Sequence, residues 1–396
     1  MIRITFIIAC VFSFNVRAEW SDVPFLNERD LLDVYFLDDN VGYVVGWSMI
    51  ASTTNGGYSW DQKYRGGTAA FNAVHFLNDK IGFVVGYKFV SSSAKPLIMK
   101  TVDAGLNWSS TVFSGDGQIS DIQFVSEFIG YAAASEGKVY KTVNGGVSWD
   151  TLQLGTNGDV RSIFFTDSVN GIAVGLESQN SPFIYRTTDG GSNWGLVPSP
   201  ATRYMQSVFF PSKLIGYTIC NDGKLLKTED GGGSWKLLGT TQGTSDLFFL
   251  NDTVGFCVGS YNPLSPFGGV LKTVNGGETW DTFTPFLWTR EFNAIHFSPS
   301  GAGYVVGPSG HIMKNSDYVT ATEELTIPKF DIFPNPCTNV LNLIPGTLSF
   351  ELFSIDGRFI EQGERNVLST SNLQPGMYII KMNDGFTINS EIFVRE

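Results

Sequence analysis

The sequence has little charge, little histidine and little cysteine. Only 16% of the 396 residues are Asp, Glu, Lys or Arg and 42% are hydrophobic, a balance that argues against a disordered chain and against a long solvated helix. Three histidines are too few for a histidine-rich metal centre, and four cysteines are too few for a disulfide-knit fold. We therefore expect neither a metal site nor any other cofactor.

Positive charge and long apolar runs are also scarce. The 26 basic residues against 38 acidic ones give a net charge of −12, and no basic cluster stands out, so no nucleic-acid partner is expected. No segment beyond residue 18 approaches the roughly 20 apolar residues of a membrane span. A phosphate-binding loop and the motifs Gly-x-Ser-x-Gly, Cys-x-x-Cys and His-Glu-x-x-His are absent from the sequence.

Glycine and phenylalanine are abundant instead. The chain has 44 glycines and 32 phenylalanines, and its apolar residues show no sustained helical period. This composition is typical of many short strands joined by tight turns. The sequence therefore predicts an all-β protein.

Residues 1–18 have the features of a signal peptide. A positive start at Arg3 precedes the apolar run Ile4–Phe14, and the small residue Ala18 suits cleavage. A lipoprotein cleavage box ending at Cys10 is the weaker alternative, because the apolar core before it would be short. Export permits disulfides, but an odd number of cysteines remains, so we expect buried thiols at Cys220, Cys257 and Cys337.

Two units alternate along the chain up to about residue 320. The first pairs a strand such as Val34–Leu37 with a glycine that opens the next strand. These glycines are Gly42, Gly82, Gly130, Gly171, Gly216, Gly255 and Gly303, at successive spacings of 40, 48, 41, 45, 39 and 48 residues. Such spacings are typical of the four-stranded blades of a propeller.

The second unit is a turn with the pattern Thr-x-Asp/Asn-x-Gly-x-x-Trp. Six copies end at Trp60, Trp108, Trp149, Trp194, Trp235 and Trp280, and a degenerate one lies near Asp317. The Asp or Asn side chain is placed to accept backbone N–H groups, and the tryptophan is placed to pack the turn against its blade. We therefore assign the repeated residues a structural role.

The seventh tryptophan is missing from the end of the repeats but present at their start. Trp20 lies 14 residues before Val34, as Trp60 does before Val74. We infer that Glu19–Phe25 supplies the last strand of the seventh blade and closes the ring without leaving an open edge. Residues 19–320 are thus predicted to form a monomeric seven-bladed β-propeller with an N-terminal strand closing the last blade.

These turns resemble the Asp-box repeats of bacterial neuraminidase-type propellers. They resemble most the repeats of the photosystem-II assembly/stability-factor propeller family. This resemblance also rests on the Val-x-Phe and Gly-Tyr-x-Val-Gly strands and on the sequence Lys-Thr-x-Asn-Gly-Gly at Lys141–Gly146. The resemblance covers about three quarters of the chain. It implies the fold and a face that binds a partner protein, but the repeated residues themselves only build turns.

The pattern changes after Ala321. Residues 321–329 are predicted to be a linker, and residues 330–396 a small C-terminal β-sandwich, because apolar alternation is broken by turns at Pro334–Pro336, Asp356–Gly357 and Pro375–Gly376. This segment resembles the C-terminal sorting domain of type IX secretion substrates in Bacteroidota. The resemblance implies passage through the outer membrane by the type IX machinery, removal of the signal peptide and sorting domain, and release or attachment at the cell surface.

The candidate ligand-binding residues lie where the repeats differ. Connections of a propeller alternate between its two faces, and only the connections between second and third strands are long, at Lys88–Leu97, Glu177–Phe183 and Ser260–Gly269. Their aromatic residues suit sugars or a protein surface, although the loops could simply cover the face. These residues are Tyr87, Phe89, Phe183, Tyr261 and Phe267.

Arginines recur just before the first strands of four repeats. They are Arg29, Arg161, Arg203 and Arg290, and there they would converge near the channel mouth and hold a carboxylate or an acidic peptide. Ordinary surface ion pairs are the alternative. His75 and His296 precede a first-strand phenylalanine, and we expect both to line the core or the channel.

These observations favour a secreted or cell-surface, non-catalytic propeller that binds a protein or a glycan on its long-loop face. The alternative is a secreted glycoside hydrolase, sialidase- or xyloglucanase-like, on the same scaffold. That activity would require a pair of acidic residues facing each other across the channel. Sialidases also need an arginine cluster with a tyrosine nucleophile, and their Arg-Ile-Pro segment is not found in the sequence.

Overall fold

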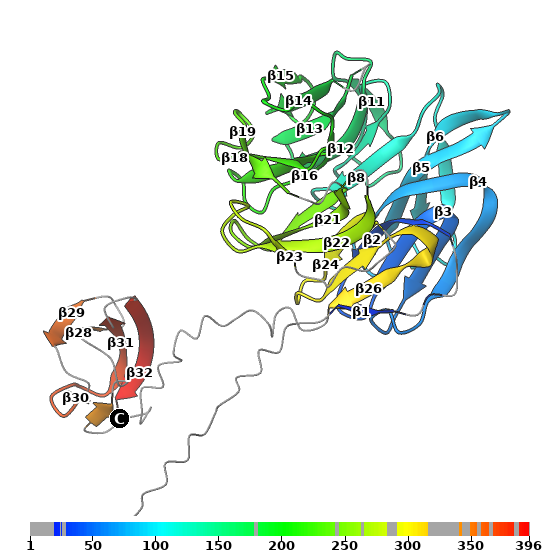
Figure 1. The fold of residues 1–396 in the computed structure, drawn as a ribbon. Coiled ribbons are helices and arrows are strands. Elements are labelled where there is room, and N and C mark those ends of the chain that lie inside the picture. The colour runs from blue at the N-terminus through cyan, green and yellow to red at the C-terminus, as the bar shows by residue number, and fades with distance from the viewer. Residues whose placement is uncertain are drawn as a thin grey trace, which may run out of the picture. The chain divides into compact units, whose positions relative to one another are not determined.

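The computed structural model describes a molecule built of strands in two units (Figure 1). The described residues are 20–23, 25, 29–177, 181–241, 245–262, 265–282, 291–315, 340–342, 349–354, 358–363, 367–383 and 388–395. The two compact units are residues 1–321 and 322–396. Within the described ranges there is no α-helix, only one turn of 3-10 helix at Pro308–Gly310, and no helix could span a membrane. The signal peptide predicted at residues 1–18 lies outside the described residues.

The first unit is an antiparallel propeller, as predicted. Four of its sheets each consist of four strands that are consecutive in the chain. The first contains β8 (Ile119–Phe124), β9 (Gly130–Ala134), β10 (Lys138–Thr142) and β11 (Asp150–Gln153), and the second contains β12 (Asp159–Phe165), β13 (Gly171–Leu176), β14 (Pro182–Thr187) and β15 (Gly195–Val197). The third contains β16 (Met205–Phe209), β17 (Gly216–Cys220), β18 (Lys224–Thr228) and β19 (Lys236–Thr240), and the fourth contains β20 (Asp246–Phe249), β21 (Gly255–Asn262), β22 (Ser265–Thr273) and β23 (Asp281–Thr282).

The predicted division into seven separate blades is wrong, because the described strands of the propeller form six sheets. The first two repeats share one six-stranded sheet: β2 (Leu31–Phe36), β3 (Gly42–Thr53), β4 (Asp61–Phe76), β5 (Gly82–Val90), β6 (Ser93–Thr101) and β7 (Ser109–Val112). β3 runs without a break through the two segments predicted as second and third strands, with a positive φ of 51° at Ser48 between them. β4 likewise combines the last strand of the first repeat with the first strand of the second.

The sixth sheet joins the two ends of the propeller, as predicted. β1 (Ser21–Asp22) pairs with β26 (Ile312–Asn315), which follows β25 (Gly303–Val306) and β24 (Ala294–Phe297). Trp20 is 8% exposed and packs edge-on against Phe297 at 6.5 Å. The six other repeat tryptophans make the same edge-on contact with a phenylalanine in or directly after a first strand, as Trp60 does with Phe36 at 6.1 Å.

The Asp/Asn turns are held by the same hydrogen bonds in all six copies that begin with Thr53, Thr101, Thr142, Thr187, Thr228 and Thr273. In one copy the Gly191 amide donates to Thr187 Oγ1 at 2.9 Å, and the Asn193 amide donates to Asp189 Oδ1 at 2.9 Å. The residue four positions after the Asp or Asn is chemically matched to it. Where the turn has Asp189, the side-chain Nδ2 of Asn193 donates a hydrogen bond to Asp189 Oδ2. Where the turn has Asn144, its own side-chain Nδ2 donates to the Ser148 hydroxyl.

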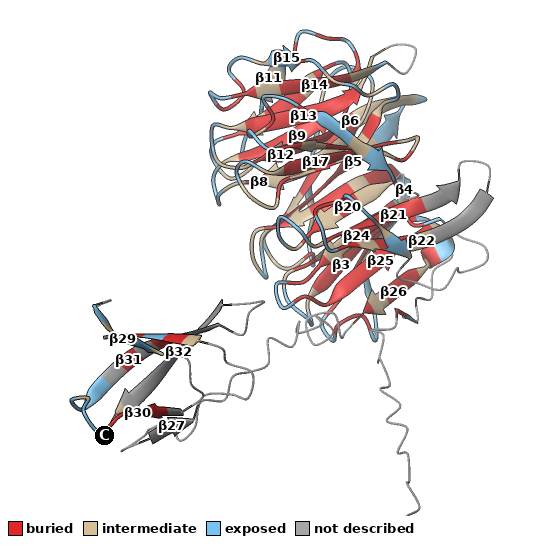
Figure 2. Ribbon diagram, turned by 60° about the vertical axis from the view of Figure 1, so that its left-hand side comes forward, coloured by how far each residue is buried: buried red, intermediate tan, exposed pale blue. Residues whose placement is uncertain are grey.

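The core lies between neighbouring sheets, where buried residues form separate clusters around the ring (Figure 2). The ring of Phe36 stacks on Tyr304 with centroids 3.4 Å apart. A Cβ on Gly42 would lie 2.4 Å from the Phe36 ring, so the repeated glycine leaves room for this aromatic stack. Cys220 and Cys257 are buried thiols, as predicted, whereas Cys337 lies outside the described residues.

The propeller has two faces that we name by their connections. The turn face carries the Asp/Asn turns, and the hairpin face carries the connections from second to third strands. The predicted long loop 88–97 is mostly a hairpin, because β5 continues to Val90 and β6 begins at Ser93. Ser91 and Ser92 form its two-residue turn, both with positive φ.

The second unit contains two described sheets. β27 (Val340–Asn342) pairs with β30 (Val367–Ser369), and a four-stranded sheet has the order β29 (Phe359–Gly363), β28 (Ser349–Ser354), β31 (Gly376–Asn383), β32 (Ile388–Arg395). The strands are antiparallel, as the alternating pattern predicts. Their assembly into a β-sandwich stays a prediction.

Candidate functional site

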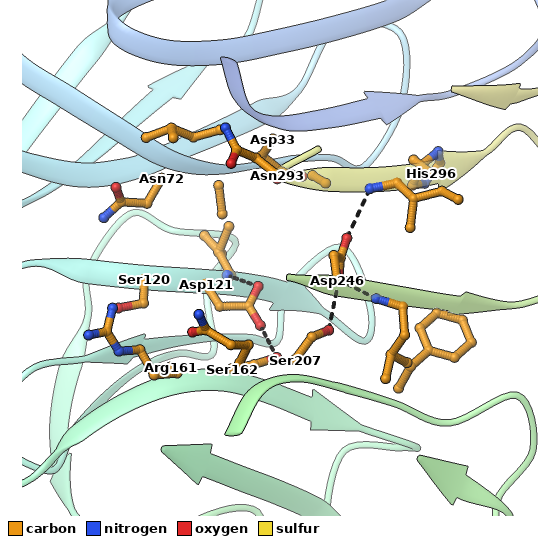
Figure 3. Close-up of a pocket in the computed structure, with 18 of the residues that line it drawn as sticks. Asp33, Asn72, Ser120, Asp121, Arg161, Ser162, Ser207, Asp246, Asn293 and His296 are labelled. Atoms are coloured by element: carbon orange, nitrogen blue, oxygen red, sulfur yellow. Dashed lines mark hydrogen bonds between the residues drawn. The ribbon is translucent and has the colours of Figure 1, made fainter. Parts of the chain in front are cut away.

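A cavity of about 350 Å³ lies at the centre of the propeller (Figure 3). Seven inner strands line it, each in contact with the next and the last with the first. They are β2, the second half of β4, β8, β12, β16, β20 and β24. The same positions of successive repeats therefore face one another around the cavity, in three layers.

The mouth layer lies where the inner strands begin, next to the hairpin face. A register shift in β2, β4, β8, β12 and β16 turns one extra residue toward the cavity. The layer consists of Leu32, Asn72, Ser120, Arg161, Gln206, Ser245 and Asn293. Two of its amides are fixed by the main chain, since Asn72 donates to the Ile119 carbonyl at 2.8 Å and Asn293 to the Leu31 carbonyl at 2.6 Å.

The carboxyl layer lies one residue further in. Asp33, Asp121 and Asp246 each accept the amide of their own successor with Oδ1 and the amide of the next repeat's inner strand with Oδ2. Ser162 and Ser207 add a hydroxyl donor to Asp121 and Asp246 (Figure 3). These carboxyls therefore connect one repeat to the next, a role that single-repeat reasoning missed. The recurrence of Asp before Val34, Ile122 and Leu247 was the available signal.

Burial governs the electrostatics of this layer. It raises the pKa of Asp246 to about 6, raises that of Asp121, and raises that of Asp33 well above its usual range. The other two carboxyls raise the pKa of Asp33 further by like-charge repulsion, while the amide hydrogen bonds oppose the shift.

The aromatic layer is the deepest. It consists of Tyr35, His75, Gln123, Phe164, Phe209, Phe248 and His296, and the rings of Tyr35 and His296 lie 4.7 Å apart. Both histidines line the channel, as predicted. Burial lowers the pKa of His75 to about 4 and that of His296 to about 3, so both are neutral, and His296 Nδ1 accepts the Phe36 amide at 3.3 Å.

Three of the four predicted arginines are described. Arg161 belongs to the mouth layer, with its guanidinium 5.9 Å from the Tyr204 ring and its Nε buried without a hydrogen-bond partner. Arg203 is exposed, and exposed Arg29 donates to the Trp47 carbonyl at 3.0 Å. Of the three, Arg161 alone lines the cavity. Arg290 lies outside the described residues.

The predicted aromatics separate into two groups. Tyr87 is half-buried and Phe89 is 43% exposed on β5, and their rings meet edge-on at 5.3 Å. Phe183 was predicted to face a ligand, which is wrong, because it is 2% exposed and belongs to a core cluster. Its ring fills the space over Gly158 and Gly175. The side chains of Tyr261 and Phe267, on β21 and β22, lie outside the described part of the structure.

Trp47 is the exposed aromatic that the sequence interpretation missed. It is 45% exposed and meets the Tyr87 ring edge-on at 6.2 Å. Its position beside the predicted residues follows from strand pairing, because Trp47 and Tyr87 both pair with Ala70. The tryptophan that ends the second strand of only the first repeat was the available signal.

In comparisons with known proteins, each of the two units matches a different family. A family model described as photosynthesis system II assembly factor YCF48 matches residues 13–316, and one described as secretion system C-terminal sorting domain matches residues 331–394. No curated protein matches the chain.

Several solved propellers are similar to the first unit. YCF48 from Cyanidioschyzon merolae is 21% identical, with a TM-score of 0.58 over 75% of this chain and 98% of that one. A structure described as YCF48 bound to D1 peptide gives the same identity and TM-score over 75% of this chain and 94% of that one. The WD40 propeller of Doa1 is 11% identical, with a TM-score of 0.59 over 74% and 94%. At these identities the likeness shows the fold alone.

Proposed function

Because the chain belongs to the family of the photosynthesis system II assembly factor YCF48, we propose that its propeller is a non-catalytic module that binds an extended peptide segment of a partner protein across the cavity mouth. The C-terminal sorting domain marks the chain for secretion or cell-surface attachment by the type IX machinery. The peptide partner would therefore be met outside the cell.

Arg161 carries this proposal. Its Nε is a buried donor without a partner, at the rim of a polar cavity, and an unmade hydrogen bond at such a group costs free energy. A carboxylate or a peptide carbonyl placed over the mouth would instead pair with the Arg161 guanidinium that lines the cavity. Arg203 is exposed on the connection that leads into the next inner strand and would add a second cation. One similar structure is described as bound to a peptide, which supports the same kind of ligand here.

The channel carboxyls favour binding over hydrolysis. A glycosidase needs one carboxyl as a proton donor and another free to act as base or nucleophile. Asp33, Asp121 and Asp246 each use both oxygens to accept backbone amides of two repeats. That engagement supports a structural role for them and gives the hydrolase alternative no separate support.

Peptide selection tests the proposal. The full chain is used to select from a displayed library of random dodecapeptides, and the enriched peptides are titrated by fluorescence polarisation against the wild type, Arg161→Gln and Lys213→Gln. Lys213 is the matched control, because it is a cation with a 77% exposed side chain on the turn face. We expect Arg161→Gln to weaken binding at least tenfold and Lys213→Gln to leave it unchanged, with both variants melting like the wild type.

Two outcomes would overturn the proposal. One is the absence of any enriched peptide, and the other is an affinity that Arg161→Gln leaves intact. Release of reducing sugar from a polysaccharide panel, lost in Asp246→Asn, would establish the hydrolase alternative instead.

We also propose that the mature protein lacks residues 1–18 and 330–396. The apolar start and the match to a sorting domain support this processing. Mass spectrometry of the exported protein would test it, since a mass retaining either segment is incompatible with the proposal.

A further inference from the structure

A second surface on the hairpin face is built from three aromatic residues outside the cavity. We call Trp47, Tyr87 and Phe89 the hairpin aromatic surface. Trp47 and Phe89 are 45% and 43% exposed, and Tyr87 between them contacts both rings edge-on. Isolated exposed aromatics are common, but three in contact on one surface indicate an interaction site.

Strand pairing explains why the three rings meet. Trp47 on β3 and Tyr87 on β5 are both opposite Ala70 on β4, so the three residues lie in one row across the sheet. Ala70 is too small to fill the space between the flanking rings. Phe89 follows Tyr87 by two residues and therefore projects from the same face of the sheet.

The strands beneath these rings are fixed from both sides. Toward β4, the Thr68 hydroxyl donates to the Phe89 carbonyl at 3.0 Å. On the other side, Asp116 accepts from the Ser93 hydroxyl at 2.5 Å and from the Lys95 ammonium at 2.6 Å. Figure 1 shows β5 and β6 as long arrows at this edge of the propeller. These bonds fix the backbone that carries the rings, which lowers the entropy cost of binding.

The local charge is opposite to that of the whole chain. The net charge of the protein is −12, yet β3, β5 and β6 contain no acidic residue, and β4 contains only Asp61. The same strands carry the cations Arg65 and Lys88, and also Lys63, Lys95 and Lys100, which bind Asp61, Asp116 and the Gly145 carbonyl. The Arg29 guanidinium also lies beside Trp47, whose carbonyl accepts its hydrogen bond. This surface therefore favours an anionic ligand.

We propose that the hairpin aromatic surface binds an acidic polysaccharide, a chain of β-linked pyranoses that carry carboxylates. The apolar C–H face of an equatorially substituted pyranose packs on an aromatic ring, and its carboxylates pair with the surrounding cations. Trp47, Tyr87 and Phe89 do not line the central cavity, so this surface is separate from the proposed peptide site. The inference does not depend on peptide binding at the cavity mouth.

Two oligosaccharides that differ only in charge test the proposal. The full chain is titrated calorimetrically with a β-1,4-linked glucuronic acid hexamer and with cellohexaose, which has the same linkage without carboxylates. We expect the acidic hexamer to bind at least fivefold more tightly at low salt, and added salt to reduce that ratio. Trp47→Ala and Phe89→Ala should each weaken both sugars at least tenfold.

Two control variants separate the surface from the rest of the protein. Phe128→Ala removes a ring that is 63% exposed on the turn face and should change neither affinity. Arg29→Gln together with Arg65→Gln should bring the two affinities together while leaving cellohexaose binding intact. Each variant should melt within about 2 °C of the wild type, because its side chain lies at the surface.

Several results would overturn the inference. They are the absence of binding to either sugar, equal affinity for both at low salt, or full binding by Trp47→Ala and Phe89→Ala. Enrichment of a peptide whose binding requires Trp47 and Phe89, without sugar binding, would show that the surface recognises a protein instead.

Discussion

The two faces of the propeller use the same kinds of residue for opposite purposes. On the turn face, the tryptophans pack edge-on against a phenylalanine and the Asp or Asn side chains accept the same backbone hydrogen bond in all six described copies. On the hairpin face, Trp47 and Phe89 are exposed. The comparison teaches that residues repeated in each blade stabilise the fold, whereas residues that differ between repeats form the surfaces available for binding.

Replacing one tryptophan on each face gives the largest expected contrast. Trp20→Ala removes an 8% exposed ring that closes the last sheet and should lower the free energy of unfolding by about 3–5 kcal/mol. Trp47→Ala removes a 45% exposed ring and should cost less than about 1 kcal/mol. Urea unfolding followed by circular dichroism measures both. Equal losses would mean that the two faces do not differ in this way.

A turn-face asparagine gives an intermediate effect. Asn144 Oδ1 accepts the Ser148 amide at 3.0 Å and the Thr142 hydroxyl at 2.9 Å, so Asn144→Ala should lower the free energy of unfolding by about 1–3 kcal/mol. Asn144→Asp is the matched control and should cost under about 0.5 kcal/mol, because the Ser148 hydroxyl is then free to donate, as Ser234 does to Asp230. Thermal melts of both variants test this, and a similar loss for both would contradict it.

The smallest expected effect is a pH dependence of opposite sign at a cavity carboxyl and at a turn-face carboxyl. The folded-state pKa of Asp246, about 6, lies above its usual 3.8, so its stabilising contribution is complete below pH 3.8 and is lost as the pH rises through 6. Hydrogen bonds lower the pKa of Asp230 to about 2, so its contribution is present above pH 3.8 and is lost as the pH falls toward 2.

Asparagine variants isolate these two contributions. Between pH 4 and 7, the unfolding free energy of the wild type should fall relative to Asp246→Asn by roughly 1–2 kcal/mol. Relative to Asp230→Asn, it should stay constant in that range and fall only below about pH 4. Urea titrations at each pH provide the measurement. A flat difference for Asp246→Asn would mean that its carboxyl is ionised throughout.

The fold was predictable wherever a local rule repeats. The spacing of the glycines and the Asp/Asn turns predicted a propeller, and the position of Trp20 predicted the closing strand, because each rests on chemistry within a few residues. The number of sheets was not predictable in the same way. Whether β3 and β4 continue through a turn depends on backbone geometry at Ser48 and Gly66–Gly67, which the residue types alone leave open.

The candidate site was predicted less completely, because its residues meet only through tertiary packing. Arg161 was identified from its place before an inner strand, but the carboxyl layer depends on amides donated by the next repeat, some 40 residues away. Phe183 was misassigned because the space that buries its ring is created by Gly175 on the neighbouring strand β13 and by Gly158 just before β12. Trp47 was missed because its partner Tyr87 belongs to a different repeat.

The pairing of β1 with β26 also has a consequence for the order of folding. Ser21 and Lys314, which pair in this sheet, are 293 residues apart in the chain. When the chain is synthesised from its N-terminus, β1 is made first and stays unpaired until the final repeat has been made. Pairing the two strands then closes a loop that contains nearly the whole propeller, which costs loop-closure entropy. The pairing of β1 with β26 therefore cannot form before the final repeat has been made, and until then the edge of β26 lacks its partner strand.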